Sequence, residues 1–116
     1  MIEGGCFCGQ IRYHILTDSP TSVDCHCSMC RRIHAAPYVT WLVVPKSSFE
    51  YRTGIPKELR SSESGTRYFC AQCGTHVACI NNTHPDIVDI PVGSLDNPDS
   101  YGPSREFYTD TRLSWC

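Results

Sequence analysis

The chain has 116 residues, of which 41% are hydrophobic and 19% are charged, and its formal net charge is −2. This length is that of one domain, and no apolar run approaches the roughly 18 residues that a membrane span requires. The charges are nearly balanced and form no block of one sign, which argues against capture of a nucleic-acid backbone. We therefore expect a single domain over residues 1–116, with no membrane and no nucleic acid among its partners.

The N-terminal segment Met1–Gly5 contains neither a basic region nor a long apolar stretch. A cleaved secretory signal has both, so we expect a cytoplasmic protein. Nine cysteines are an unusual number for a chain of this length. In a reducing compartment, closely spaced cysteines bind metal more often than they form disulfides. The composition therefore favours a metal-binding protein.

Short β-rich segments follow one another along most of the chain. They are Gln10–Leu16, Pro37–Val44, Ser48–Thr53, Thr66–Phe69, Thr75–Ile80 and Ile87–Val92, with Gly, Pro, Asn or Asp between most of them. One short helix is expected at Ser28–His34, because Ser28 can cap its first turn and Pro37 blocks its extension. Arg60–Gly65 is expected to be a loop. The pattern predicts a mainly β domain with mostly antiparallel pairing and one short helix.

Seven of the nine cysteines lie in three close groups. The groups are Cys6 and Cys8, then Cys25, Cys27 and Cys30, then Cys70 and Cys73, whereas Cys79 and Cys116 stand alone. The Cys70-x-x-Cys73-Gly74 spacing is typical of a zinc knuckle, in which a tight turn places two thiolates on one ion. With Cys6 and Cys8 it supplies four ligands, which predicts a structural zinc ion. Two separate redox dithiols are the alternative, and no long helix follows Cys73 to support them.

The middle group differs because it supplies three thiolates, from Cys25, Cys27 and Cys30, to an ion that takes four ligands. Three protein ligands are typical of a catalytic zinc, whose fourth position accepts water or a substrate thiolate. This predicts a second zinc ion with a catalytic role. The alternative is a second structural site closed by one further side chain, for which the candidates are His26, His34, Cys79 and Cys116. Of these, His34 is best placed on a continuing helix.

Two arginines follow the middle group directly. Arg31 and Arg32 place positive charge beside Cys30, which lowers the pKa of a thiol. Guanidinium groups also bind carboxylates through charge-assisted hydrogen bonds. We therefore predict that both arginines bind the ligand, and the alternative is that they form a solvated face of the helix.

Five motifs occur in order along the chain. They are Gly4–Tyr13, Cys25–Arg32, Ala36–Trp41, Arg67–Thr75 and Val92–Pro98. Together they resemble the glutathione-dependent formaldehyde-activating enzyme family, which also includes centromere protein V. The resemblance implies coiled antiparallel β-sheets stapled by zinc, similar to the fold of methionine-R-sulfoxide reductases. It also implies a structural zinc on Cys6, Cys8, Cys70 and Cys73 and a catalytic zinc on Cys25, Cys27 and Cys30.

The activity attached to this family is the condensation of glutathione with formaldehyde, formally that of a carbon–sulfur lyase working in the synthetic direction. The resemblance therefore implies a small thiol such as glutathione as the partner, with Arg31 and Arg32 on its carboxylates and Arg67 as a further candidate. Ala35 stands where similar sequences usually carry glycine, which leaves the backbone path there to be determined. The alternatives are a non-catalytic zinc-stabilised β module for protein interaction and dithiol redox chemistry.

Overall fold

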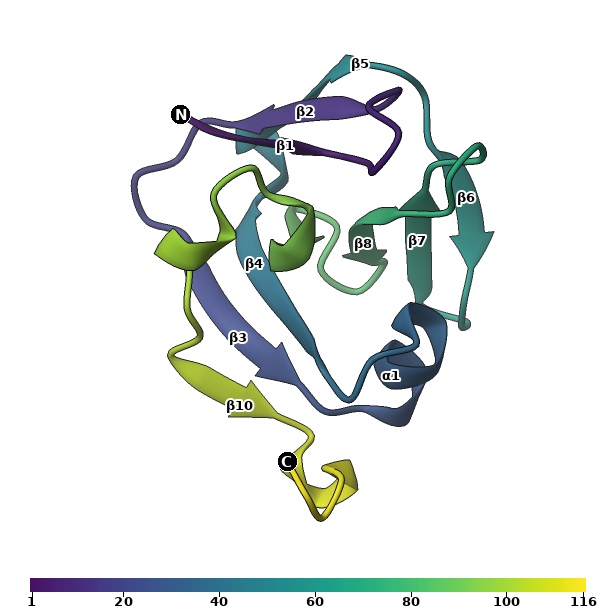
Figure 1. Cartoon of the computed structure of the whole chain (residues 1–116), viewed down its shortest axis with the longest axis vertical. Helices are drawn as coiled ribbons and strands as arrows, with labels where there is room; N and C mark the ends of the chain where they lie inside the picture. Colours follow the sequence, from purple (N-terminus) through teal and green to yellow (C-terminus); the bar gives the residue numbers. More distant parts are fainter.

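The computed structural model describes residues 1–116 as ten strands and one α-helix, with short 3-10 turns between them (Figure 1). The elements are β1 (Ile2–Gly5), β2 (Arg12–Ile15), β3 (Thr21–Cys25), α1 (Ser28–His34), β4 (Val39–Pro45), β5 (Phe49–Thr53), β6 (Lys57–Arg60), β7 (Gly65–Phe69), β8 (His76–Asn81), β9 (Ile87–Pro91) and β10 (Arg105–Phe107). This confirms the mainly β class and the single short helix. No helix combines the length and the apolar character needed to cross a membrane.

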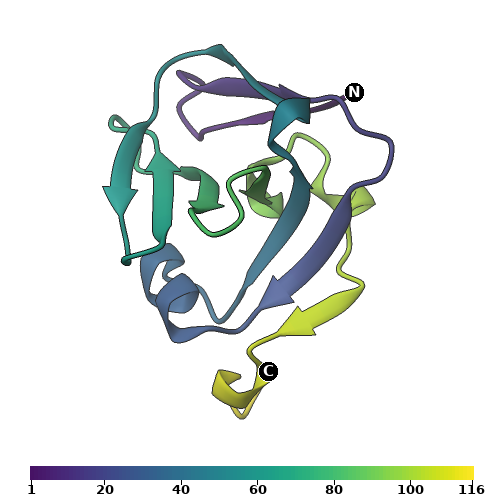
Figure 2. The same cartoon turned by 180° about the vertical axis from the view of Figure 1, so that it is seen from behind.

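The strands form two sheets. A three-stranded sheet has the order β1-β2-β5, and a seven-stranded sheet has the order β10-β3-β4-β9-β8-β7-β6. All strand pairs are antiparallel except β10 with β3. Figures 1 and 2 show β1 and β2 at one end of the molecule and the C-terminal segment beyond β10 at the other end.

The two faces of the seven-stranded sheet have different roles. Successive side chains of a strand point to opposite faces, so Leu42 and Val44 of β4 pack into the main core, which the two sheets share. Trp41 points to the other face, where a second cluster contains Val23, Val39, Cys25 and Cys30. The second face is therefore apolar as well, and its cluster includes two of the cysteines of the middle group.

The N-cap of helix α1 lies one residue earlier than the sequence indicates. Its N-cap is Cys27, whose Sγ accepts the backbone N–H of Cys30 at 3.2 Å, so Ser28 is the first helical residue and not the cap. The helix ends at His34, and its C-cap, Ala35, adopts φ 51° and ψ 45°. This is the left-handed conformation that glycine usually supplies at a helix end. The backbone therefore keeps the path of a glycine-terminated helix.

Gly4 gives a sharp test of how β1 packs. A Cβ atom at Gly4 would lie 2.6 Å from the carbonyl oxygen of Ser94 and would also collide with the hydroxyl of Tyr13. We expect Gly4→Ala to lower the free energy of unfolding by about 1–3 kcal/mol, the usual cost of overpacking. Gly93→Ala is the matched control, because a Cβ atom there meets open space. Urea denaturation of the two variants measures the difference, and equal stability would contradict this packing.

Candidate metal centres and an adjoining cavity

The first and the third group of cysteines lie together in one cluster, here called the four-thiol cluster. The sulfur atoms of Cys6, Cys8, Cys70 and Cys73 all lie within 4.8 Å of one another. One pair follows β1 of the small sheet and the other follows β7 of the large sheet. Each pair is followed by a glycine with positive φ, Gly9 at 82° and Gly74 at 81°. The two turns therefore bring four thiols from the two sheets to one point.

Local hydrogen bonds lower the pKa of two of these thiols, Cys6 and Cys73, whereas burial and the neighbouring thiols raise the pKa of Cys8. The hydroxyl of Thr75 lies 3.3 Å from Cys73 Sγ and is the main cause that lowers the pKa of Cys73 to about 5. The backbone N–H of Ile11 donates to Cys6 Sγ at 3.2 Å. Thiolates are the ligands that zinc takes in structural sites. The donor set and its surroundings therefore fit a zinc ion.

The middle group forms a second cluster, here called the three-thiol cluster. The sulfur atoms of Cys25, Cys27 and Cys30 lie within 4.8 Å of one another. Cys25 is the last residue of β3, Cys27 is the N-cap of α1, and Cys30 lies in the first turn of the helix. The passage from strand end to helix start therefore turns three neighbouring side chains toward one point.

Arg67 contacts this cluster from β7, which is separated from β3 in the large sheet by β4, β9 and β8. Its Nη2 donates to Cys30 Sγ at 3.5 Å. The pKa of Cys30 is lowered to about 5, mainly by the hydrogen bond that Cys25 donates at 3.6 Å and further by the bond from Arg67, against the effect of burial. Cys30 is thus the thiol of the cluster that is favoured as a thiolate, whereas the pKa of Cys25 is raised by its hydrogen bond to Cys30 and by burial. Three thiols that include one ready thiolate fit the binding of a divalent metal ion.

A cavity of about 590 Å³ adjoins the three-thiol cluster and is called the thiol cavity below. All three of its cysteines line the cavity, and so does Arg67. The second face of the large sheet contributes Val23, Trp41, Val43, Cys79 and Asp89, and the turn between β6 and β7 contributes Ser61, Ser62 and Ser64. Phe107 and Tyr108 close it from the C-terminal segment. The cavity therefore combines apolar walls with the thiols and two charged side chains.

The two arginines of the helix lie elsewhere. Arg31 and Arg32 line a separate cavity of about 600 Å³, together with Leu113 and Trp115. Arg31 Nη1 also donates to the carbonyl oxygen of Thr111 at 3.0 Å. Neither arginine borders the thiol cavity. The contact between these arginines and a ligand remains a prediction. Such a contact would lie in this separate cavity and not in the thiol cavity.

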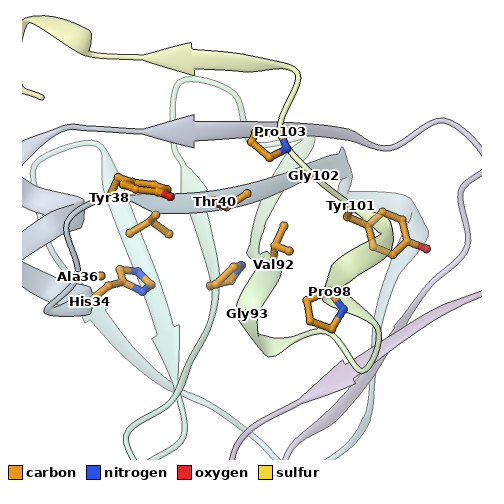
Figure 3. A pocket seen from close by; sticks show the side chains of 12 residues that line it. His34, Ala36, Tyr38, Thr40, Val92, Gly93, Pro98, Tyr101, Gly102 and Pro103 are labelled. Carbon is orange, nitrogen blue, oxygen red and sulfur yellow. The ribbon is translucent and has the colours of Figure 1, made fainter. Parts of the chain in front are cut away.

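The four side chains weighed as a fourth ligand lie in four different surroundings. His26 Nε2 pairs with Glu106 Oε1 at 3.0 Å. The ring of His34 packs against Trp41 and His76 and lines a pocket of about 450 Å³ that contains no cysteine (Figure 3). In Figure 3 His34 stands at one end of this pocket, and Tyr101 and Pro98 stand at the other. Cys79 borders the thiol cavity, and Cys116 is exposed.

Asp89 is the cavity residue that sequence reasoning missed. It is the one charged residue of β9, among Ile87, Val88, Ile90 and Pro91. A carboxylate in an otherwise apolar strand is costly to bury, and this signal was available in the sequence. Burial raises the pKa of Asp89 to about 6, the nearby Cys30 adds to the rise, and Arg67 opposes it.

We expect the carboxyl carbon of Asp89 to titrate with a midpoint near 6 in a ¹³C NMR experiment, well above its ordinary value of 3.8. Because folding raises this pKa, its contribution to stability is present below about pH 4 and is lost as the pH rises through about 6. Asp89→Asn cannot ionise, so its stability relative to the wild type is expected to increase over this range. A midpoint close to 3.8 would contradict the burial of this group.

Comparisons with known proteins agree with the fold. A solved crystal structure of a Rhodobacter sphaeroides protein superposes with a TM-score of 0.72 at 21% identity, covering 90% of this chain and 98% of that one. An uncharacterized lyase of Schizosaccharomyces pombe is 29% identical over 89 residues, which are 75% of this chain and 64% of the relative. This chain thus spans slightly less than two thirds of that lyase.

A second curated relative matches over more of the chain. A candidate glutathione-dependent formaldehyde-activating enzyme of Halomonas elongata is 25% identical over 115 residues, 90% of this chain and 72% of the relative. The family model described as glutathione-dependent formaldehyde-activating enzyme matches residues 1–111. The chain therefore belongs to the glutathione-dependent formaldehyde-activating enzyme family, as its five sequence motifs indicate.

Proposed function

We propose that the protein is a zinc-dependent carbon–sulfur lyase-type enzyme that adds a small thiol such as glutathione to formaldehyde or a related small electrophile. The observation that carries this proposal is that the three-thiol cluster lines a cavity of about 590 Å³, whereas the four-thiol cluster does not border it. A site that is saturated by four protein thiols serves the fold, and a site with three leaves room for a substrate. The lyase and formaldehyde-activating names of the relatives support the same reaction class.

The residues of the chain have separable roles in this proposal. Cys25, Cys27 and Cys30 would hold the catalytic zinc ion, and Cys6, Cys8, Cys70 and Cys73 the structural one. When bound by three thiolates, zinc lowers the pKa of a further thiol that binds to it. Arg67 donates to Cys30 Sγ through its Nη2 and adds to the stabilisation that Cys25 gives to this thiolate. The apolar walls at Trp41 and Val43 would reduce the hydration of the substrate sulfur, which would leave this sulfur a stronger nucleophile.

The overall reaction balances without a redox partner. The thiol loses its proton, the sulfur–carbon bond forms as the carbonyl double bond opens, and the former carbonyl oxygen takes up a proton. The product is the S-hydroxymethyl adduct of the thiol, a hemithioacetal.

The test is two-dimensional exchange NMR with ¹³C-formaldehyde and glutathione, which measures the rate of exchange between free formaldehyde and the adduct. Catalytic amounts of the reduced, zinc-loaded protein are expected to raise the exchange rate between free formaldehyde and the adduct. Cys116→Ser removes an exposed thiol outside both clusters and is expected to behave as the wild type. An exchange rate equal to that of the protein-free mixture would contradict the proposal.

A non-catalytic zinc-stabilised module for protein interaction is the second candidate. The observation that favours it is the exposure of two large apolar side chains, Phe7 at 92% and Ile55 at 91%. Exposed apolar groups of this kind occur at protein interfaces. In this case the protein retains its zinc and leaves the exchange rate unchanged, so the same experiment separates the two functions.

A further inference from the structure

Arg67 is a buried arginine with one free donor. Its side chain is only 5% exposed, with Nε donating to Ser61 Oγ at 3.1 Å and Nη2 donating to Cys30 Sγ at 3.5 Å. Its Nη1 is buried and has no hydrogen-bond partner in the chain. A charged donor without an acceptor is costly in a protein interior. Because Arg67 lines the thiol cavity, its free donor indicates that the cavity receives an acceptor from a ligand.

Asp89 is an opposite charge in the same cavity. Its carboxylate makes no hydrogen bond or ion pair within the chain and lines the cavity beside Val43 and Cys79. A half-buried carboxylate that lines a cavity can accept hydrogen bonds from a ligand that enters it. The cavity therefore offers one unpaired donor and one unpaired acceptor, both from charged side chains.

The sheet holds these two charges apart. Arg67 of β7 pairs with Cys79 of β8, and Cys79 pairs with Asp89 of β9, so the three residues stand in a row on one face. Adjacent strands lie about 4.8 Å apart, which separates the two charged residues by two strand spacings. They form no direct ion pair with each other, and a ligand that carries both charges a few ångströms apart fits between them. The contact of Arg67 with Cys30 places the donor beside the three-thiol cluster.

We propose that the thiol cavity selects zwitterionic thiols of the α-amino-acid class, with Arg67 Nη1 donating to the carboxylate and the Asp89 carboxylate accepting from the ammonium group. This assignment rests on the proposed thiol chemistry and adds the substrate class and two specificity-determining residues. Thiols that lack one of the two charges leave one of these side chains unpaired and bind more weakly.

Trp41 supplies a direct binding signal. It lines the cavity and its ring lies 5.9 Å from Cζ of Arg67. In a Trp115→Phe background it is the sole tryptophan, so its fluorescence reports ligand entry. The probes are cysteine with both charges, 3-mercaptopropionate with the carboxylate, cysteamine with the ammonium group, and 2-mercaptoethanol with neither. Cysteine is expected to bind most tightly, with an affinity loss of about tenfold for each missing charge.

Two substitutions assign each charge to its residue. Arg67→Gln is expected to remove the advantage of the carboxylate-bearing probes and to leave that of the ammonium group, and Asp89→Asn is expected to do the reverse. Arg60→Gln and Asp86→Asn are the matched controls, because both residues are exposed and lie outside the cavity. If Arg67→Gln does not fold, the nearly isosteric Asp89→Asn still tests the assignment through the cysteamine and 2-mercaptoethanol pair.

Serine separates this inference from the proposed function. Binding of serine as tightly as cysteine, with the same loss in both variants, would support the zwitterion site and contradict the thiol chemistry. Equal binding of all four thiols would overturn the zwitterion site and leave the thiol chemistry in place. Binding of neither cysteine nor serine would overturn both.

Discussion

Replacing Cys73 by serine is expected to unfold the protein. The four-thiol cluster joins the turn after β1 to the turn after β7, which belong to different sheets. Zinc binding in small structural sites contributes about 10–16 kcal/mol, whereas the net stability of a domain is only about 5–15 kcal/mol. If the site loses its zinc ion together with one ligand, the lost free energy is comparable to the whole net stability of the fold. Circular dichroism with thermal melting is the measurement, and the variant is expected to lack a cooperative transition.

The control for this experiment is Cys116→Ser, which removes an exposed thiol outside both clusters. It is expected to melt as the wild type does and to retain the same zinc content. A cooperative transition at the wild-type temperature in Cys73→Ser would show that the four-thiol cluster does not staple the sheets.

Replacing Cys27 by serine is expected to abolish the exchange activity while leaving the fold nearly intact. Cys27 Sγ caps α1 by accepting the N–H of Cys30, and serine is itself a favoured N-cap residue. The variant therefore keeps the helix start and loses one thiolate from the three-thiol cluster. We expect one zinc ion fewer per chain than in the wild type, together with an exchange rate at the protein-free level. Zinc analysis and exchange NMR measure the two effects.

Cys79→Ser is the matched control for zinc content, because Cys79 borders the same cavity and stands outside the cluster. It is expected to retain both ions. If Cys27→Ser and Cys73→Ser unfold the protein to the same degree, both clusters are structural, and the interaction module becomes the better account.

The strands that could be predicted are those in which apolar residues alternate or run together. β4 shows this in Val39–Pro45 and β9 in Ile87–Pro91, and both are central in the large sheet. Four strands were missed. β1 and β3 are short but partly buried, and the other two carry weaker local signals. Lys57–Arg60 and Arg105–Phe107 are exposed along their whole length and form the two edges of that sheet. Such edge strands form because a partner strand is available, which the local sequence does not encode.

The cysteine clusters could be expected from spacing alone, because each group forms within one turn. The thiol cavity could not, since its lining comes from seven elements that only the strand order brings together. The arginines show the difference. Arg31 is adjacent to Cys30 in sequence, yet one residue on a helix is a rotation of about 100°, and its side chain borders another cavity. Arg67 is distant in sequence and contacts Cys30 directly.

Cadmium-113 NMR of the cadmium-substituted protein tests the central claim most directly, because each bound ion gives its own signal. The account predicts two signals, of which only the one lost in Cys27→Ser moves when glutathione or cysteine is added. Two signals that both stay in place at saturating thiol, or a single signal per chain, would contradict the division between a saturated cluster and one that accepts a substrate.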